Sequence, residues 1–232
     1  MSGFDTDPEP ADSRAPVRLW DWPIRLVHWS FVLLMPALWW TFRSGRMETH
    51  ELLGYITLGL LVFRIFWGFA GGSTARFSGF VKDPRAVARY ARSLFGEPGE
   101  PVVGHNPLGG WSALVLLGLM ISEVGLGLFA QDTDGIVSGP LTRYVSYEIA
   151  DRARDLHELG FNLLLGFIAL HVAAILFYLL VKRDNLVGPM ITGQKRMAAL
   201  PSPPTFAAWR RIAIGAVLGA GAAWWVSLGC PL

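Results

Sequence analysis

Five long apolar segments constrain the fold of this chain more than any other feature of its sequence. Each approaches the roughly 20 residues that an α-helix needs to cross a bilayer. Hydrophobic residues make up 52% of the 232 residues and charged residues only 16%, against about 25% in soluble domains. Helices satisfy their own backbone hydrogen bonds in lipid, so we expect an all-α, polytopic membrane protein. The expected spans are residues 26–42, 52–70, 111–130, 159–181 and 207–228.

The distribution of Lys and Arg over the loops predicts the orientation of these spans. In the loops and at the ends of the spans, 14 of these residues lie on the side of the N-terminus and 5 on the opposite side. Cytoplasmic loops are enriched in Lys and Arg, so the N-terminus is expected in the cytoplasm and the C-terminus outside. Topology explains the basic loops, and we expect no nucleic-acid partner. The leader, residues 1–16, is acidic, unlike a signal peptide, so the first span should be retained.

Four of the five histidines fall in or beside the apolar spans at two depths. His28 lies near the inner start of the first span and His50 at the outer start of the second. His157 and His171 share the fourth span, 14 residues apart, which is roughly 21 Å of helical rise on nearly the same face. Because the fourth span runs inward, His157 matches the depth of His50, and His171 matches that of His28. The sequence therefore predicts two stacked metal centres, with His28 and His171 as the inner ligands and His50 and His157 as the outer ligands.

The shortage of cysteine limits which metal cofactors the four histidines could bind. Cys230 is the single cysteine, which excludes a covalent Cys-x-x-Cys-His haem site and an iron–sulfur cluster. Two noncovalently bound haem groups, each with two axial histidines, fit a chain that has four such histidines and one cysteine. The alternative is a haem-free transporter that uses the same intramembrane histidines as a proton or metal relay.

Three further polar residues are candidates for the site. Arg64 follows His50 by 14 residues at the depth of the inner pair, where it contacts a haem propionate or extends to the cytoplasmic surface. His105 precedes a helix start and is either a loop histidine or a quinone or propionate contact. Glu123 lies within the third span, in the outer half of the bilayer. Glu123 either accepts a proton during quinol oxidation or is structural, bonded to a neighbouring helix or paired with an outer arginine.

A series of motifs in the chain resembles the bacterial and archaeal di-haem cytochrome b561 family, which is grouped with the cytochrome b subunits of nickel–iron hydrogenases. The resemblance covers roughly Val17 to Met197, and Glu123 departs from the neutral residue more usual in that family. The motifs, in order, are Trp20-Asp21-Trp22-Pro23-Ile24-Arg25-Leu26-Val27-His28-Trp29, His50-Glu51-Leu52-Leu53-Gly54-Tyr55, Arg64-Ile65-Phe66-Trp67-Gly68-Phe69, Ala75-Arg76-Phe77, Gly104-His105-Asn106-Pro107-Leu108-Gly109-Gly110, and His157-Glu158 through His171-Val172.

The resemblance implies a four-helix bundle with two bis-histidine haem b groups, in a bacterial inner membrane. Such a protein carries electrons between the quinone pool and a partner, either a hydrogenase-type oxidoreductase or a periplasmic cytochrome c. The implied division of the chain is a polar leader at 1–16, a di-haem domain at 17–197 and an additional C-terminal transmembrane helix at 198–232. The sequence leaves a homodimer open.

Overall fold

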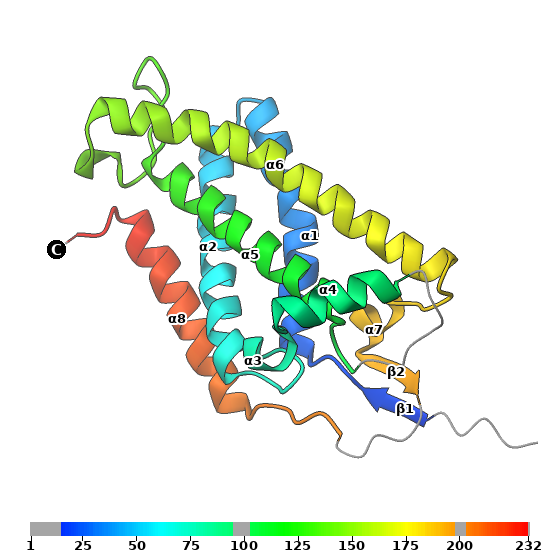
Figure 1. Cartoon of the computed structure of the whole chain (residues 1–232). Helices are drawn as coiled ribbons and strands as arrows, with labels where there is room; N and C mark the ends of the chain where they lie inside the picture. Colours follow the sequence, from blue (N-terminus) through cyan, green and yellow to red (C-terminus); the bar gives the residue numbers. More distant parts are fainter. Residues whose placement is uncertain (1–14, 95–102, 198–202, 232) are drawn as a thin grey trace, which may run out of the picture.

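The computed structural model describes residues 15–94, 103–197 and 203–231, and five long helices dominate it (Figure 1). Short helices and one two-stranded sheet connect them. The long helices are α1 (Trp22–Arg43), α2 (Met47–Ala70), α5 (Pro107–Phe129), α6 (Tyr147–Leu180) and α8 (Trp209–Ser227). The connecting elements are β1 (Ala15–Arg18), α3 (Phe77–Phe80), α4 (Pro84–Ser93), the 3-10 helix η1 (Thr142–Tyr144), α7 (Val187–Thr192) and β2 (Gln194–Met197).

Helix starts are encoded by a capping side chain followed by proline in the first turn. The carboxylate of Asp21 accepts a hydrogen bond from the Ile24 amide at the start of α1, and Asn106 accepts one from the Gly109 amide at the start of α5. Asp83 caps α4 in the same way. Such caps satisfy amides that have no partner inside the helix, and proline loses nothing there because its nitrogen carries no hydrogen.

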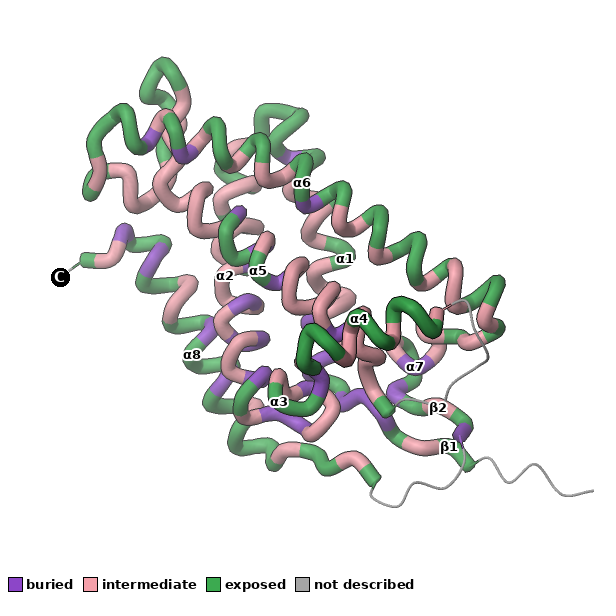
Figure 2. Tube along the Cα trace, in the orientation of Figure 1, coloured by how far each residue is buried: buried purple, intermediate pink, exposed green. Residues whose placement is uncertain are grey.

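The long helices run antiparallel, which gives the bundle two ends. At the basal end α1, α5 and α8 begin and α2 and α6 finish; the opposite end is called distal (Figure 1). Helix α2 packs against α1, α5 and α8, whereas α6 packs mainly against α5. Many of the buried residues gather towards the basal end, around the start of α1 and the end of α2 (Figure 2). A second apolar cluster in mid-bundle joins four helices, with Leu61, Leu117, Met120 and Leu164 at its centre.

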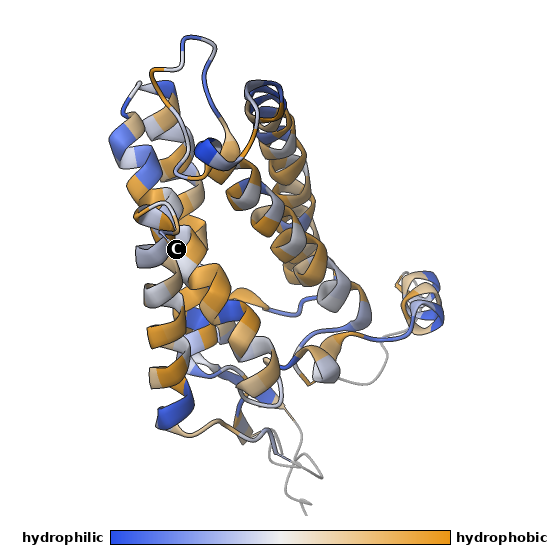
Figure 3. Cartoon of the chain, turned by 90° about the vertical axis from the view of Figure 1, so that its left-hand side faces the viewer, coloured by the Kyte–Doolittle hydropathy of each residue, from blue (hydrophilic) through white to orange (hydrophobic). Residues whose placement is uncertain are grey.

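The outer surface of the bundle is apolar over most of its length (Figure 3). Among the described residues, three helices are both long and apolar enough to cross a membrane: α2, α5 and α6. Helices α1 and α8 span 22 and 19 residues but carry arginines and several tryptophans, which lower their hydropathy. The chain is therefore a helical membrane protein with three clear candidate spans, and the status of α1 and α8 as spans stays a prediction.

The structure departs from the sequence expectations in two places. The fold is not purely helical, because β1 pairs antiparallel with β2 and places Ala15 opposite Met197. The expected fourth span begins at residue 159, but α6 begins at Tyr147, because its first three turns are helical without being continuously apolar. Of the expected leader, residues 1–14 lie outside the described residues and the remainder belongs to β1.

Asp21 also ties two helices together, and its removal should be costly. It is only 4% exposed, and its second carboxylate oxygen accepts a 3.0 Å hydrogen bond from the indole of Trp67 on α2. Asp21→Ala removes a helix cap and leaves a buried N–H without a partner, so we expect about 3 kcal/mol of destabilisation. Thermal unfolding in detergent measures it. Asp83→Ala, which removes an exposed cap only, should cost about 1 kcal/mol, and equal losses in both variants would contradict this account.

Candidate functional site

The structure brings His50 and His157 together at the distal end. His50 lies in the first turns of α2 and His157 in α6, and their ring centres are 6.4 Å apart with the ring planes at 88°. An imidazole nitrogen binds a first-row metal ion at about 2 Å, and the ring centre lies about 1 Å behind that nitrogen, so two rings on opposite sides of one ion have centres about 6 Å apart. The observed separation therefore suits two axial ligands of one iron.

Hydrogen bonds at the other ring nitrogen prepare both distal histidines as ligands. Nδ1 of His50 lies 3.0 Å from the carbonyl oxygen of Leu38, and Nδ1 of His157 lies 2.9 Å from the carbonyl oxygen of Glu123. A carbonyl oxygen only accepts, so Nδ1 must be the donor in each ring. Nε2 then carries the free lone pair, which is the arrangement that metal-binding histidines usually show.

At the basal end His28 and His171 lie close enough to interact electrostatically. His105 and Arg64 belong to the same group, since Arg64, His171 and His28 all act on His105. Helix α1 contributes His28, α2 contributes Arg64, and α6 contributes His171, while His105 directly precedes the cap of α5. His50 and His157 are thus in contact and His28 lies near His171, while the role of the two pairs as iron ligands stays a prediction.

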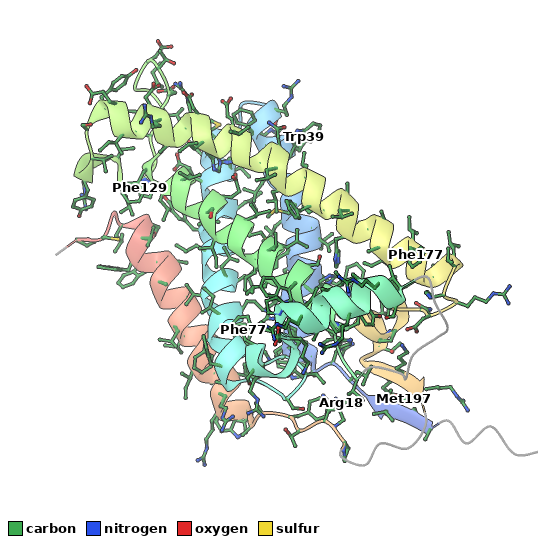
Figure 4. The ribbon with its side chains drawn as sticks, in the orientation of Figure 1. Arg18, Trp39, Phe77, Phe129, Phe177 and Met197 are labelled. Atoms are coloured by element: carbon green, nitrogen blue, oxygen red, sulfur yellow. The ribbon has the colours of Figure 1, made fainter. Side chains whose placement is uncertain are left out.

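Arg64 is buried in the bundle and does not extend to the surface. Its side chain is 8% exposed, and its guanidinium lies over the rings of Phe77 and Phe80, at 5.1 and 5.9 Å from their centres. Figure 4 shows Phe77, from α3, beside the end of α2. The guanidinium forms no ion pair within the described part of the chain, and its Nη1 is buried without a hydrogen-bond partner. The alternative in which Arg64 reaches the cytoplasmic surface is therefore wrong.

His105 is held between two aromatic rings. Its ring centre lies 4.7 Å from that of Trp20 and 4.7 Å from that of Phe80. Burial, followed by the nearby Arg64, His171 and His28, lowers the pKa of His105 to about 3, so the ring is neutral at physiological pH. The expected cap is confirmed, because Asn106 accepts a 2.7 Å hydrogen bond from the Gly109 amide. Nδ1 of His105 nevertheless has no partner.

These residues fit haem b. Buried nitrogens without hydrogen-bond partners are rare, yet four of the five buried side-chain atoms that lack a partner in the described chain are nitrogens of the basal end. Haem carries two carboxylates that would meet such donors. Along α6 only three of 34 residues are buried, so most of this helix is not covered by the chain's own side chains. The four basal nitrogens without a hydrogen-bond partner, introduced above, are Arg25 Nε, His28 Nδ1, Arg64 Nη1 and His105 Nδ1.

Glu123 lies next to the distal pair. Its carboxylate oxygen Oε2 is 3.2 Å from Nδ1 of His157, and the residue is 7% exposed. The ion pair with an outer arginine, one of the alternatives for Glu123, does not form among the described residues, because the carboxylate faces His157 on the neighbouring helix α6. This contact depends on how α5 is rotated against α6, and no periodicity within either helix indicates it. The capping role of Asp21, in contrast, had a signal in the sequence, because an acidic residue directly precedes Trp22-Pro23.

The fold and the site together define a class of protein: a helical membrane protein with histidine pairs at both ends of one bundle. The family model for prokaryotic cytochrome b561 matches residues 19–193, so the chain belongs to the prokaryotic cytochrome b561 family. It is thus a membrane-bound, haem b-containing protein of electron transport, as the motifs in its sequence indicated. Membership of a cytochrome family does not support the haem-free transporter alternative.

Curated relatives agree with this assignment. The chain is similar to a probable Ni/Fe-hydrogenase B-type cytochrome subunit of Rhizobium leguminosarum bv. viciae, with 24% identity over 226 residues that cover 82% of this chain and 93% of the relative. A protein of the same description from Cupriavidus necator is 26% identical over 212 residues, covering 78% of this chain and 84% of the relative. No solved structure matches the chain significantly.

Proposed function

We propose that the chain is a di-haem cytochrome b that carries electrons across the bacterial inner membrane between the quinone pool and a partner redox protein. The observation that carries the proposal is the presence of two histidine pairs at opposite ends of one bundle. His28 and His171 would hold the basal haem, and His50 and His157 the distal one. Residues 17–197 would form this di-haem unit, and residues 198–232 would add a further membrane helix.

The proposed topology has five spans, with the basal end at the cytoplasm. It places the N-terminus in the cytoplasm and the C-terminus in the periplasm, as the distribution of Lys and Arg favours. Helices α1 and α8 are then spans because they run alongside α2 over much of its length (Figures 1 and 3). Their tryptophans near the helix ends suit the membrane interface.

The chain's own residues set the conditions for electron transfer. When bound, haem b supplies an iron that accepts and releases one electron. Two histidine ligands per haem would leave no open position on the iron, so the sites would suit electron transfer and disfavour oxygen binding. Leu61, Leu117, Met120 and Leu164 pack between the two pairs, and this apolar layer keeps water and ions out of the middle of the bundle.

Basic and polar groups at the basal end would bind the haem carboxylates. Arg64 is the strongest candidate, because a buried guanidinium without an anionic partner is costly and its forked donors match a carboxylate. His105 would add a neutral donor through Nδ1. His105 would contact a haem propionate and would not bind the iron.

The partner is proposed from the relatives. Both are described as Ni/Fe-hydrogenase cytochrome subunits, which supports a hydrogenase-type oxidoreductase as the redox partner. A periplasmic cytochrome c is the second candidate, supported by the acidic side chains at the distal end. Between residues 132 and 155 these are Asp132, Asp134, Glu148, Asp151 and Asp155, against Arg143, Arg152 and Arg154.

Reconstitution into proteoliposomes tests the proposal. With ferricyanide trapped inside and a membrane-soluble quinol added outside, the haem-loaded chain should reduce the trapped ferricyanide. Liposomes that contain haem-depleted protein are the control. The proposed function would be wrong if protein whose haems are fully reduced by dithionite passes electrons no faster than this control.

A further inference from the structure

One proposed iron ligand has an acidic side chain behind it. Nδ1 of His157 lies 2.9 Å from the carbonyl oxygen and 3.2 Å from carboxylate Oε2 of the same residue, Glu123. The ring N–H is hydrogen-bonded to the carbonyl oxygen, and the carboxylate of the same residue lies beside this nitrogen within ion-pair distance. Glu123 is 7% exposed, so water competes little for this N–H.

Two glycines make the space for this contact. A Cβ atom at Gly160, one turn along α6 from His157, would overlap Oε1 of Glu123. A Cβ atom at Gly127, one turn along α5 from Glu123, would lie 3.2 Å from Cε1 of His157. Any larger side chain at either position would push the carboxylate or the ring away. The crossing of α5 and α6 is thus shaped around the Glu123–His157 pair.

The second ring nitrogens of His50 and His28 have no carboxylate beside them. Nδ1 of His50 lies near the carbonyl oxygen of Leu38 and, at 3.4 Å, near the hydroxyl of Thr41. Nδ1 of His28 is buried without a partner. Within the described residues, His157 is the histidine whose ring meets a carboxylate. The distal site is therefore chemically asymmetric across its two ligands.

We propose that Glu123 is a positioning residue, which orients the His157 ring through Nδ1 and lowers the reduction potential of the distal haem. This inference rests on the proposed function, because it requires a haem at His50 and His157. A carboxylate beside Nδ1 polarises the ring N–H and would increase the electron donation of the ligand through Nε2, which would stabilise the oxidised iron over the reduced iron. The basal haem lacks this contact, so the effect is confined to one of the two centres.

Redox titration of the full-length, haem-loaded protein tests the inference. Glu123→Gln keeps the size of the side chain but removes the carboxylate beside Nδ1, so both haems should stay bound while the distal midpoint potential rises. A tenfold shift of the one-electron equilibrium is expected, which corresponds to about 59 mV. The distal centre is identified as the one lost in His50→Ala. Ser122→Ala is the matched control, since the Ser122 hydroxyl bonds only to the Gly118 carbonyl within the described chain.

Glu123→Leu removes the carboxylate, keeps the backbone carbonyl that accepts from Nδ1 of His157, and separates the inference from the proposed function. Loss of a group that holds a metal ligand typically costs 10–100-fold in affinity, so the distal haem should be lost preferentially, with an altered low-spin EPR signal. Wild-type distal potential, EPR signal and haem content in both Glu123 variants would overturn the role of Glu123 while leaving the di-haem proposal intact. Wild-type protein without a second haem would instead overturn the di-haem proposal.

Discussion

His171→Ala should yield a folded protein that keeps the distal haem and loses the basal one. The two histidine pairs lie at opposite ends of the bundle, with an apolar layer between them. Removal of one axial ligand at the basal end therefore leaves His50 and His157 untouched. Haem content should fall by half, and transmembrane electron transfer should be abolished. Haem quantification and the reduced-minus-oxidised spectrum of the purified variant measure both effects.

Variants at the other histidines are the controls for this pairing. His28→Ala should reproduce the loss seen in His171→Ala, whereas His157→Ala should remove the complementary haem. His105→Gln should keep both haems, because His105 is placed beside the basal pair without being assigned to the iron. Loss of both haems from folded His171→Ala protein, or loss of the distal haem alone, would contradict the assignment.

Gly219→Leu should separate α8 from α2 and destabilise the protein by about 3 kcal/mol or more, because overpacked sites force backbone shifts. At this crossing a Cβ atom on Gly219 would overlap the carbonyl oxygen of Gly59, and backbone atoms cannot rotate away as a side chain can. Close approach of helices through small residues is a usual way for helices to associate in membranes. Thermal unfolding in detergent, followed by haem absorbance, measures the loss.

Gly221 provides a matched control on the same helix. A Cβ atom there meets nothing within 4 Å, so Gly221→Leu should leave the unfolding temperature close to that of the wild type. Equal losses of stability in Gly219→Leu and Gly221→Leu would mean that leucine destabilises α8 itself at either position. The α2–α8 contact would then not be the cause.

Hydrophobic segment length predicted where the long helices lie but not where each begins. The expected third span at residues 111–130 is close to α5, because its start is marked by Asn106 and Pro107. The predicted start of the fourth span lies twelve residues after the start of α6, because the first turns of this helix carry charges such as Asp151 and Arg154. Hydropathy detects the part of a helix that suits lipid, and a helix can continue beyond that part.

The small sheet could not be anticipated from the sequence. Strands β1 and β2 are four residues each and are far apart in the sequence, directly before and directly after the residues that the family model matches. Their pairing places Arg18 opposite Gln194. Neither has the alternation of apolar and polar residues over several positions that predicts a strand. Their pairing depends on how the bundle brings the two segments together.

The shared depth of His50 with His157 and of His28 with His171 was predictable because helical rise converts sequence separation directly into depth. Partners of the ring nitrogens were not, since they depend on the rotation of one helix against another. The approach of Glu123 to His157 and the burial of Arg64 beneath Phe77 and Phe80 belong to this second kind. The residue pattern within one helix predicts the depth of a side chain in the membrane and the helix face on which it lies. Tertiary packing decides which atoms come into contact.

The number of haems bound per chain tests the central claim most directly. A pyridine haemochrome assay on purified protein, saturated with haem and normalised to chain concentration, counts them without reference to activity. The two histidine pairs predict two haem b groups per chain. A value of one haem per chain in fully loaded protein would contradict the account, because one of the pairs would then hold no iron.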